Sequence, residues 1–380
     1  MGRQRAFDSL AAPGVRGLRP YMPGKSTEEL ERQYGIAESI KLASNENPMG
    51  PAPAAIAAVR GELSDLALYP DGSGFRLKAA LASRFGVEPE RVTLGNGSNE
   101  ILVLLAETFL EPGLEAVYDE HAFAVYRLVV QATGAEGRVA RSQSSAQAQP
   151  RGHDVEAIRA LITSRTRLIF IANPNNPTGT WLTHDELFEF VRGVPGNVIV
   201  VVDEAYSEYV TRDDYPQTIG WLDEFPNLVI TRTFSKIYGL AGLRVGYALS
   251  DPDIAELLNR VRAPFNVNSL ALTAALAALG DEAFVAEARR MNAAELVVLS
   301  SGLRELGFEV TPSIGNFLLV GLGRPAGPVY EALLQRGIIV RPVANYGLPN
   351  HLRITVGLPE QNQLVLRALS QLVKAGCLDD

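Results

Sequence analysis

The sequence predicts an α/β protein in which a mostly parallel sheet lies between helices, together with a smaller α+β unit. Three continuous apolar runs predict the sheet, at Leu168–Ala172, Val198–Val202 and Leu228–Ile230. They are short, rich in β-branched residues and without alternation, which is typical of strands buried on both faces of a parallel sheet. Helical stretches between them, of which His184–Val191 is the clearest, fit crossover connections.

The length and the net charge of the chain exclude several classes of protein. The chain has 380 residues, with 35 basic and 43 acidic side chains and a formal net charge of −8. This length predicts two domains, one large and one small. The acidic balance argues against nucleic acid as a partner, and no apolar run approaches the roughly 18 residues of a membrane span. The arginine-rich N-terminus lacks the apolar segment of a secretory signal, so we expect a cytoplasmic protein.

The composition and the apolar pattern of the sequence change along the chain, and these changes predict the domain limits. Residues 1–45 form an arm and part of the small domain, residues 46–270 form the large domain, and residues 271–380 form the small C-terminal domain. A polar low-complexity loop lies at 141–152. The single cysteine, Cys377, excludes an internal disulfide, and with four scattered histidines we expect no metal site.

The strongest chemical feature is the segment Thr233–Gly246, which follows a predicted strand. Lys236 lies just beyond the strand, close to Thr233 and Ser235 and eight residues before Arg244. A partly buried lysine near a cation has a lowered pKa, which makes its amine nucleophilic. The hydroxyls and the arginine would together bind a phosphate. A surface lysine with a structural arginine is equally compatible with this spacing.

Two further segments follow predicted strands. Asp203 and Tyr206 come at the end of Val198–Val202. Ligands of open α/β sheets lie outside the carboxyl ends of the strands, so an acid there can hold a positive charge on a ligand. Asn176 lies in the turn Asn173–Gly179, whose prolines fix the backbone and aim the amide at a ligand. The alternatives are a solvated acid and a plain structural turn.

A glycine-rich turn, Gly95–Glu100, precedes an apolar-periodic helix. Its free N–H groups and the helix dipole suit an anion. Because Glu100 occupies the third glycine position of the dinucleotide-binding fingerprint, a phosphate cradle of another kind fits better.

Two arginines in the C-terminal part lie in otherwise apolar strands. Arg341 follows Ile338–Val340, and Arg353 lies inside Leu352–Val356. Arginine is costly there unless it has an anionic partner. A buried ion pair with a carboxylate of the protein and the binding of an external anion are equally open.

The order and spacing of these motifs are specific. Asp203 comes 27 residues after Asn176, Lys236 comes 33 residues later, and Arg244 eight residues after that. This order resembles the pyridoxal-phosphate aminotransferases of fold type I, and within them the histidinol-phosphate aminotransferases. The resemblance covers nearly the whole chain. It implies a large, mostly parallel sheet of the seven-stranded type. It includes the segments Arg19–Gly24, Leu42–Pro48, Tyr69–Asp71, Val202–Tyr206 and Leu352–Gly357.

The resemblance implies a pyridoxal 5'-phosphate cofactor and a role for each matching residue. Lys236 would form a Schiff base with its aldehyde and then act as general base and acid. Asp203 would pair with the pyridine nitrogen, while Tyr206 and Asn176 would hydrogen-bond the ring hydroxyl oxygen. Phe123, where relatives more often carry tyrosine, would stack on the ring. The phosphate would be bound by Gly97, Ser98, Asn99, Thr233, Ser235 and Arg244.

The remaining residues concern the substrates and the partner subunit. The resemblance implies a homodimer in which Tyr69 reaches the phosphate bound by the other subunit. Arg353 and Arg341 lie where the family binds the anionic end of its substrates, and Tyr21 and Asn45 would line the entrance. The implied reaction converts histidinol phosphate and 2-oxoglutarate into imidazole-acetol phosphate and glutamate, in histidine biosynthesis.

Three other functions stay open. An aromatic amino-acid aminotransferase would share every cofactor residue. A pyridoxal-phosphate decarboxylase of phosphorylated amino acids would share the fold, and carbon dioxide release would reveal it. A non-enzymatic regulator on this fold would need a DNA-binding helical extension, for which the arm before Asn45 is too short and irregular.

Overall fold

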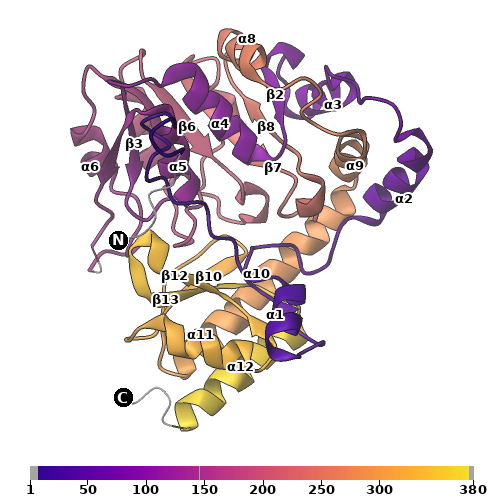
Figure 1. Cartoon of the computed structure of the whole chain (residues 1–380), viewed down its shortest axis with the longest axis vertical. Helices are drawn as coiled ribbons and strands as arrows, with labels where there is room; N and C mark the ends of the chain where they lie inside the picture. The colour runs from indigo at the N-terminus through magenta and orange to yellow at the C-terminus, as the bar shows by residue number, and fades with distance from the viewer. Residues whose placement is uncertain (1–6, 145, 376–380) are drawn as a thin grey trace.

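The computed structural model describes residues 7–144 and 146–375, so Cys377 lies outside the described residues. Figure 1 shows two parts, a larger one around a seven-stranded sheet and a smaller one around a four-stranded sheet. The long helix α10 (Glu282–Glu305) runs from the first part into the second. The predicted domain limits stay a prediction.

The large sheet has the strand order β2-β8-β7-β6-β5-β3-β4. Strands β7, β6, β5, β3 and β4 run parallel, whereas β8 is antiparallel to both of its neighbours. The sheet is therefore mostly parallel, as predicted. Its strands are β2 (Val92–Gly95), β3 (Glu115–Asp119), β4 (Glu136–Ala140), β5 (Thr166–Ala172), β6 (Ile199–Asp203), β7 (Leu228–Thr233) and β8 (Gly246–Leu249).

Helices cover both faces of this sheet, and β5 shows the consequence. Ile169 and Ile171 belong to the core on one face, whereas Leu168 and Phe170 belong to the core on the other. The continuous apolar runs of the sequence thus mark strands buried on both sides. One face is covered by α4 (Ser98–Phe109), α5 (Ala124–Thr133) and α8 (Pro252–Val261). The other is covered by α2 (Pro53–Glu62), α3 (Phe75–Phe85), α6 (Val155–Ala160), α7 (His184–Arg192) and α9 (Ser269–Gly280).

The smaller sheet has the order β12-β13-β10-β9 and is antiparallel throughout. A segment near the N-terminus joins this part, because β1 (Ile40–Lys41) pairs in parallel with β11 (Ile338–Ile339). Helix α1 packs on α11, because Leu30 and Tyr34 lie in one apolar cluster with Tyr330 and Leu334 (Figure 1). The remaining elements are α1 (Thr27–Tyr34), β9 (Glu309–Val310), β10 (Phe317–Gly321), α11 (Ala326–Leu334), β12 (Arg341–Val343), β13 (Leu348–Thr355) and α12 (Pro359–Lys374).

Short connections complete the chain. The helical pattern at 270–306 is interrupted at Asp281, whose carboxylate accepts a hydrogen bond from the Phe284 N–H and so starts α10 as a separate helix. Within the described residues no single helix is long and apolar enough to cross a bilayer, although α9 and α10 together, bent by 77°, reach that length and composition. Short 3-10 helices lie at Leu63–Asp65, Pro89–Arg91, Ser207–Tyr209, Thr218–Trp221, Ala241–Leu243 and Ala344–Tyr346.

The start of α4 packs closely on the start of β8. A Cβ atom on Gly246 would lie 2.3 Å from the backbone nitrogen of Ser98 and 2.8 Å from the carbonyl carbon of Gly97. Because these are backbone atoms, they cannot turn aside as a side chain would. A glycine at this position is therefore required to bring the N-terminus of α4 next to the carboxyl end of β7.

The Gly246→Ala variant tests this close approach. The added methyl group should force β8 and α4 apart and lower the free energy of unfolding by about 1–3 kcal/mol, the usual cost of overpacking. Gly327→Ala is the matched control, since the space around Gly327 in α11 is open and its change to alanine should stabilise by about 0.5–1 kcal/mol. Chemical denaturation measures both, and equal stability of the two variants would contradict the prediction.

Candidate active site

A cavity of about 610 Å³ lies between the two parts of the molecule, at the carboxyl ends of β5, β6 and β7. It brings together most of the residues singled out in the sequence. Those that line it are Tyr21, Asn45, Ser98, Asn99, Phe123, Asn176, Asp203, Tyr206, Thr233, Ser235, Lys236, Arg244, Arg341 and Arg353. Gly97 lies against the guanidinium of Arg244, and Tyr69 lies elsewhere on the chain.

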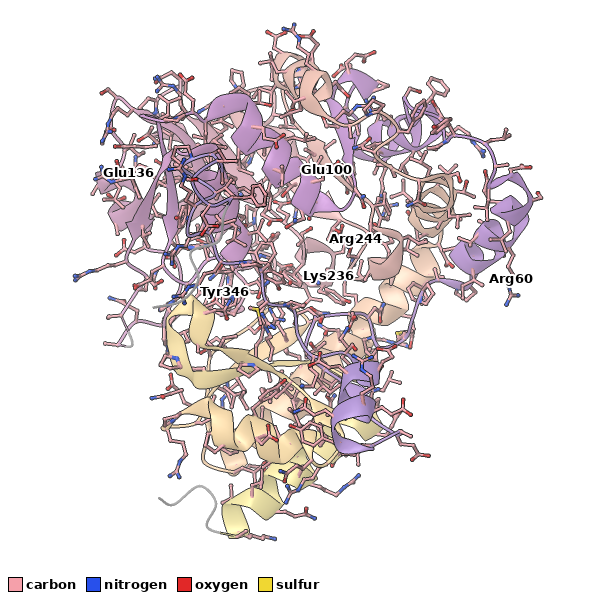
Figure 2. The ribbon with its side chains drawn as sticks, in the orientation of Figure 1. Arg60, Glu100, Glu136, Lys236, Arg244 and Tyr346 are labelled. Atoms are coloured by element: carbon pink, nitrogen blue, oxygen red, sulfur yellow. The ribbon has the colours of Figure 1, made fainter. Side chains whose placement is uncertain are left out.

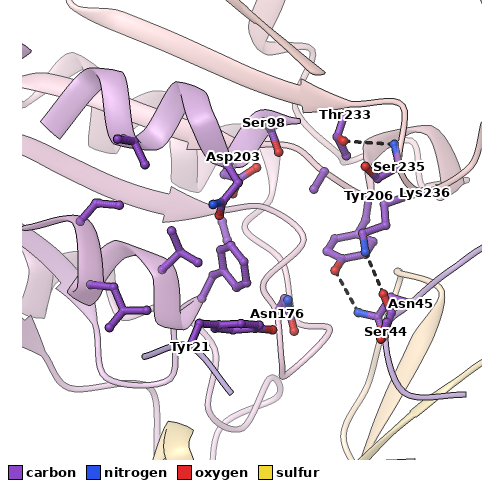
Figure 3. Close-up of a pocket in the computed structure, with 18 of the residues that line it drawn as sticks. Tyr21, Ser44, Asn45, Ser98, Asn176, Asp203, Tyr206, Thr233, Ser235 and Lys236 are labelled. Carbon is purple, nitrogen blue, oxygen red and sulfur yellow. Dashed lines mark hydrogen bonds between the residues drawn. The ribbon is translucent and has the colours of Figure 1, made fainter. Parts of the chain in front are cut away.

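Lys236 extends into this cavity from the loop after β7. Its Nζ donates a hydrogen bond to the Ser44 carbonyl oxygen at 2.9 Å and lies 5.6 Å from the centre of the Tyr206 ring (Figure 3). Burial, followed by the charge of Arg353, lowers the pKa of the lysine to about 7. Figure 2 shows Lys236 and Arg244 at the junction of the two parts. Lys236 is thus a cavity residue whose amine is largely neutral just above neutral pH.

Asp203 ends β6 and presents a buried carboxylate to the cavity. Its Oδ1 accepts a hydrogen bond from the Thr231 hydroxyl at 3.0 Å, and its Oδ2 accepts one from the Tyr126 hydroxyl at 2.8 Å. Burial raises the pKa of this carboxyl above its usual value, whereas the two hydroxyl donors act in the opposite direction. Both donors are neutral, so the negative charge remains available to a cationic group in the cavity.

Tyr206 and two asparagines surround the space beside Lys236. The Tyr206 hydroxyl accepts a hydrogen bond from the Asn45 side-chain amide at 2.9 Å (Figure 3). Asn45 is held by the hydroxyl of Thr355 on β13, and it has a positive φ of 55°. The Asn176 side-chain oxygen accepts a hydrogen bond from Arg353 at 2.5 Å. Residues from the segments after β5, β6 and β1 and from β13 therefore meet in one polar cluster.

The N-terminus of α4 and the segment after β7 form a cradle of donors. Gly97, with a φ of 75°, precedes α4, whose first N–H groups have no side-chain cap. A Cβ atom on Gly97 would lie 2.5 Å from Arg244 Nη2, so a larger residue would displace that guanidinium, and the positive φ itself favours glycine. Arg244 Nη1 donates to the Ser235 hydroxyl at 3.3 Å. Helix dipole, hydroxyls and guanidinium together suit a phosphate group.

Arg341 and Arg353 face each other across the antiparallel pair β12–β13, as directly paired residues. Arg353 donates to the oxygens of Asn176 and Ala43, its Nε is buried without a partner, and Arg341 donates to the Met22 carbonyl. Among the described residues neither arginine forms an ion pair with a carboxylate. Like charges directly opposite are destabilising, so this pair is suited to an external anion.

Aromatic rings form the other wall. Phe123, at the start of α5, packs edge-on against Tyr126 at 5.9 Å and against Tyr21 of the arm at 6.5 Å. The guanidinium of Arg341 lies 5.8 Å from the Tyr21 ring centre. The arm before α1 thus closes the cavity on the side of the two arginines.

Tyr69 does not reach this cavity in its own chain. The side chain is 82% exposed and stacks on the ring of Phe265, at 4.7 Å between ring centres. Its predicted contact with the phosphate of a second subunit stays a prediction.

Several residues of the site were missed from the sequence, among them Tyr126 and Ser44. Tyr126 hydrogen-bonds Asp203, but its position in an apolar helix gave no signal apart from core packing. Ser44 binds Lys236 through its backbone carbonyl, an interaction that no side-chain pattern reveals. The sequence pointed to these two positions only through neighbouring predicted residues, Phe123 in the case of Tyr126 and Asn45 in the case of Ser44.

Comparison with known proteins identifies the family. The model of the aminotransferase class I and II family matches residues 37–369. The chain belongs to this family. Two curated relatives bear the name histidinol-phosphate aminotransferase 2. The one from Pseudomonas fluorescens strain Pf-5 is 56% identical over 97% of this chain and 98% of its own, and the one from Methylococcus capsulatus is 54% identical over 97% and 99%.

A solved structure supports the same assignment. Histidinol-phosphate aminotransferase from Sinorhizobium meliloti, crystallised in complex with pyridoxal-5'-phosphate, is 29% identical and superposes with a TM-score of 0.87. The match covers 97% of this chain and 98% of the other. This aminotransferase chain therefore has fold type I, as the sequence predicted.

The lowered pKa of Lys236 can be tested in this aminotransferase by chemical labelling. In protein freed of small ligands, an amine-reactive acylating reagent should modify Lys236 with a midpoint near pH 7, because only the neutral amine reacts. An exposed lysine should show a midpoint near about 10.4. Peptide mapping separates Lys236 from the other lysines, Lys25, Lys41, Lys78 and Lys374. A midpoint of Lys236 at about 10.4 would contradict the assignment.

Proposed function

We propose that this chain is a pyridoxal-phosphate-dependent histidinol-phosphate aminotransferase of L-histidine biosynthesis. It transfers the amino group of histidinol phosphate to 2-oxoglutarate and yields imidazole-acetol phosphate and glutamate. The observation that carries the proposal is the arginine pair Arg341 and Arg353, which faces the same cavity as Lys236 and has no carboxylate partner among the described residues. The names of the closely similar relatives support the same substrate.

The residues present fit the cofactor. The absence of a Cβ on Gly97 leaves a cradle in which the N-terminus of α4, Ser235 and Arg244 would hold the phosphate. Asp203 would hold the protonated pyridine nitrogen, because its carboxylate is buried and the hydroxyls of Tyr126 and Thr231 that bond it are neutral. When bound, the cofactor supplies an electron sink for the carbon that carries the amino group.

Lys236 moves the proton. With a pKa of about 7, its Nζ would take a proton from the substrate carbon that bears the amino group and deliver it to the cofactor carbon that is joined to the same nitrogen. The Ser44 carbonyl oxygen orients Nζ by a 2.9 Å hydrogen bond, and the ring of Tyr206 excludes water from one side. Tyr206 and Asn176 would position the ring hydroxyl oxygen, and Phe123 would lie against the ring face.

The two arginines explain how one site accepts two unlike substrates. A guanidinium presents paired donors that match both a phosphate and a carboxylate. Arg353 keeps an unpaired buried Nε, so an incoming anion gains a hydrogen bond that the protein itself does not make. Tyr21 and Asn45 would line the entrance beside this pair. We expect Arg353 and Arg341 to bind the anionic groups of both substrates in turn.

The alternative functions would give different products. An aromatic amino-acid aminotransferase would use phenylalanine or tyrosine at least as well as histidinol phosphate. A decarboxylase of phosphorylated amino acids would release carbon dioxide. A transamination panel against 2-oxoglutarate, with a carbon dioxide assay, separates these functions. The cytoplasmic location expected from the composition stays a prediction.

Substrate discrimination tests the proposed role of the arginines. Histidinol, which lacks the phosphate, would leave two guanidinium groups desolvated and unpaired, so we expect kcat/KM to fall about a hundredfold or more. Arg353→Ala should weaken both half-reactions. Arg341→Ala should affect histidinol phosphate at least as much as glutamate. Steady-state kinetics of the wild type and of both variants with histidinol, histidinol phosphate and glutamate measures this, and equal wild-type rates with histidinol and histidinol phosphate would favour the aromatic aminotransferase.

We further propose a homodimer in which Tyr69 completes the site of the partner subunit. The exposure of Tyr69 supports this arrangement, because the same stretch of chain exposes several large apolar side chains that a second copy would cover. These side chains are Leu63, Leu66, Leu68 and Phe75.

Subunit mixing tests the dimer. Tyr69→Ala should lower activity at limiting cofactor about tenfold or more, because a phosphate contact is lost. Lys236→Ala should be inactive. Refolding an equal mixture should restore about a quarter of the sites, since a two-fold dimer of the two variants has one native site. Each variant refolded alone is the control, and a mixture no more active than the Tyr69→Ala variant would place Tyr69 outside the partner's site.

A further inference from the structure

Tyr126 occupies an unusual position for a core aromatic. It lies in the first turn of α5, its side chain is fully buried, and its ring stacks on Phe170 of β5 at 4.8 Å with 9° between the planes. Phe123 packs edge-on against the same ring at 5.9 Å. These two contacts fix the ring plane, and with it the direction of the hydroxyl. That hydroxyl donates to Asp203 Oδ2 at 2.8 Å.

The carboxylate of Asp203 is held from two sides. Thr231 of β7 donates to Oδ1 at 3.0 Å, while Tyr126 of α5 donates to Oδ2. Two donors on different elements prevent rotation of the carboxylate about its terminal bond. Hydrogen bonds to an ionised acceptor in a buried site are about twice as strong as neutral ones, so the arrangement also favours the charged form.

We infer that Tyr126 is a positioning residue for the reaction, whose hydroxyl holds the Asp203 carboxylate ionised and aimed at the cavity. Burial alone would favour the neutral acid, and the Tyr126 hydrogen bond is the largest effect that lowers the pKa of Asp203. The titratable groups near the carboxylate are Tyr126 on α5, Glu204 and Tyr206 after it in the chain, Tyr215, and Lys236 after β7. Of these groups, Tyr126 is the one whose side chain hydrogen-bonds the Asp203 carboxylate directly.

This inference rests on the proposed function, because Asp203 is useful in this way only if a protonated pyridine nitrogen lies against it. The consequence concerns the cofactor rather than the substrate. Loss of the Tyr126 hydroxyl should weaken the hold on the charged ring and leave the two arginines untouched. The turnover number should therefore fall while the Michaelis constants stay nearly constant.

The Tyr126→Phe holoenzyme tests this, since phenylalanine fills the same space and removes only the hydroxyl. We expect kcat to fall about tenfold, with KM for both substrates unchanged within about twofold, from the loss of one hydrogen bond to a charged group. The acidic limb of the kcat profile should move up by about one pH unit, because Asp203 would gain a proton more easily. When protein freed of cofactor is titrated with pyridoxal phosphate, the concentration that gives half of the full visible absorbance should rise about tenfold.

Tyr209→Phe is the matched control. Tyr209 is also buried, but its hydroxyl lies beside the Asn316 side chain and does not bond Asp203, so this variant should retain the wild-type pH profile and cofactor affinity. Thr231→Val should shift the acidic limb in the same direction as Tyr126→Phe, and Thr231→Ser should restore it.

A double-mutant cycle separates positioning from packing. In an Asp203→Asn background, Tyr126→Phe should cost nothing further in cofactor affinity, because the ionised acceptor is gone. Equal losses in both backgrounds, or a Tyr126→Phe pH profile that superposes on those of the wild type and Tyr209→Phe, would overturn the inference and leave Tyr126 a packing residue. A wild-type protein that binds no pyridoxal phosphate would instead overturn the proposed function.

Discussion

The register of the parallel strands β5, β6 and β7 is the constraint on which the site depends. Ala172, Asp203 and Thr231 are paired in one row across these strands. Since parallel strands end on the same edge of a sheet, the residues that follow that row must emerge together. Asn176, Tyr206 and Lys236 do so, although they are separated by long stretches of chain. A slip of one residue would turn the Asp203 side chain to the opposite face of the sheet.

Charge is distributed unevenly around the cavity, and each group is stabilised in a different way. Asp203 is buried among hydroxyls, Arg353 among amide and carbonyl oxygens, and Lys236 loses part of its basicity between them. None of these charges is neutralised by a direct ion pair between them. The protein thereby bears a desolvation cost that a bound ligand with a cationic ring and an anionic end can offset.

Much of this arrangement was predictable from the sequence, and the failures have physical reasons. The buried strands β5, β6 and β7 each contain a continuous apolar run, so their composition identified them. Strand β3 was missed because it begins at Glu115, a fully buried acid that Arg138 and Arg165 neutralise from other elements. Strand β4 lies at the sheet edge and is largely exposed, which removes its apolar pattern.

Prediction of the site from the sequence was limited in a similar way. The positions of Lys236 and Arg244 followed from a local motif, so spacing sufficed to pair them. The pairing of Arg341 with Arg353 required the register of two strands joined by a tight connection, which apolar runs alone do not define. Whether an arginine had a carboxylate partner was also undecidable from the sequence, because the partners are a side-chain amide and backbone carbonyls.

The short strand β1 has a mechanical consequence. In the residues that follow it, the backbone of Leu42 bonds to Ile339 of β11 and to Thr355 of the small sheet. The next carbonyls, of Ala43 and Ser44, accept from Arg353 and Lys236 respectively. Two consecutive carbonyls of the backbone therefore hold the guanidinium and the amine. A displacement of the small sheet that moved this segment would shift the hydrogen-bond acceptors of both side chains together.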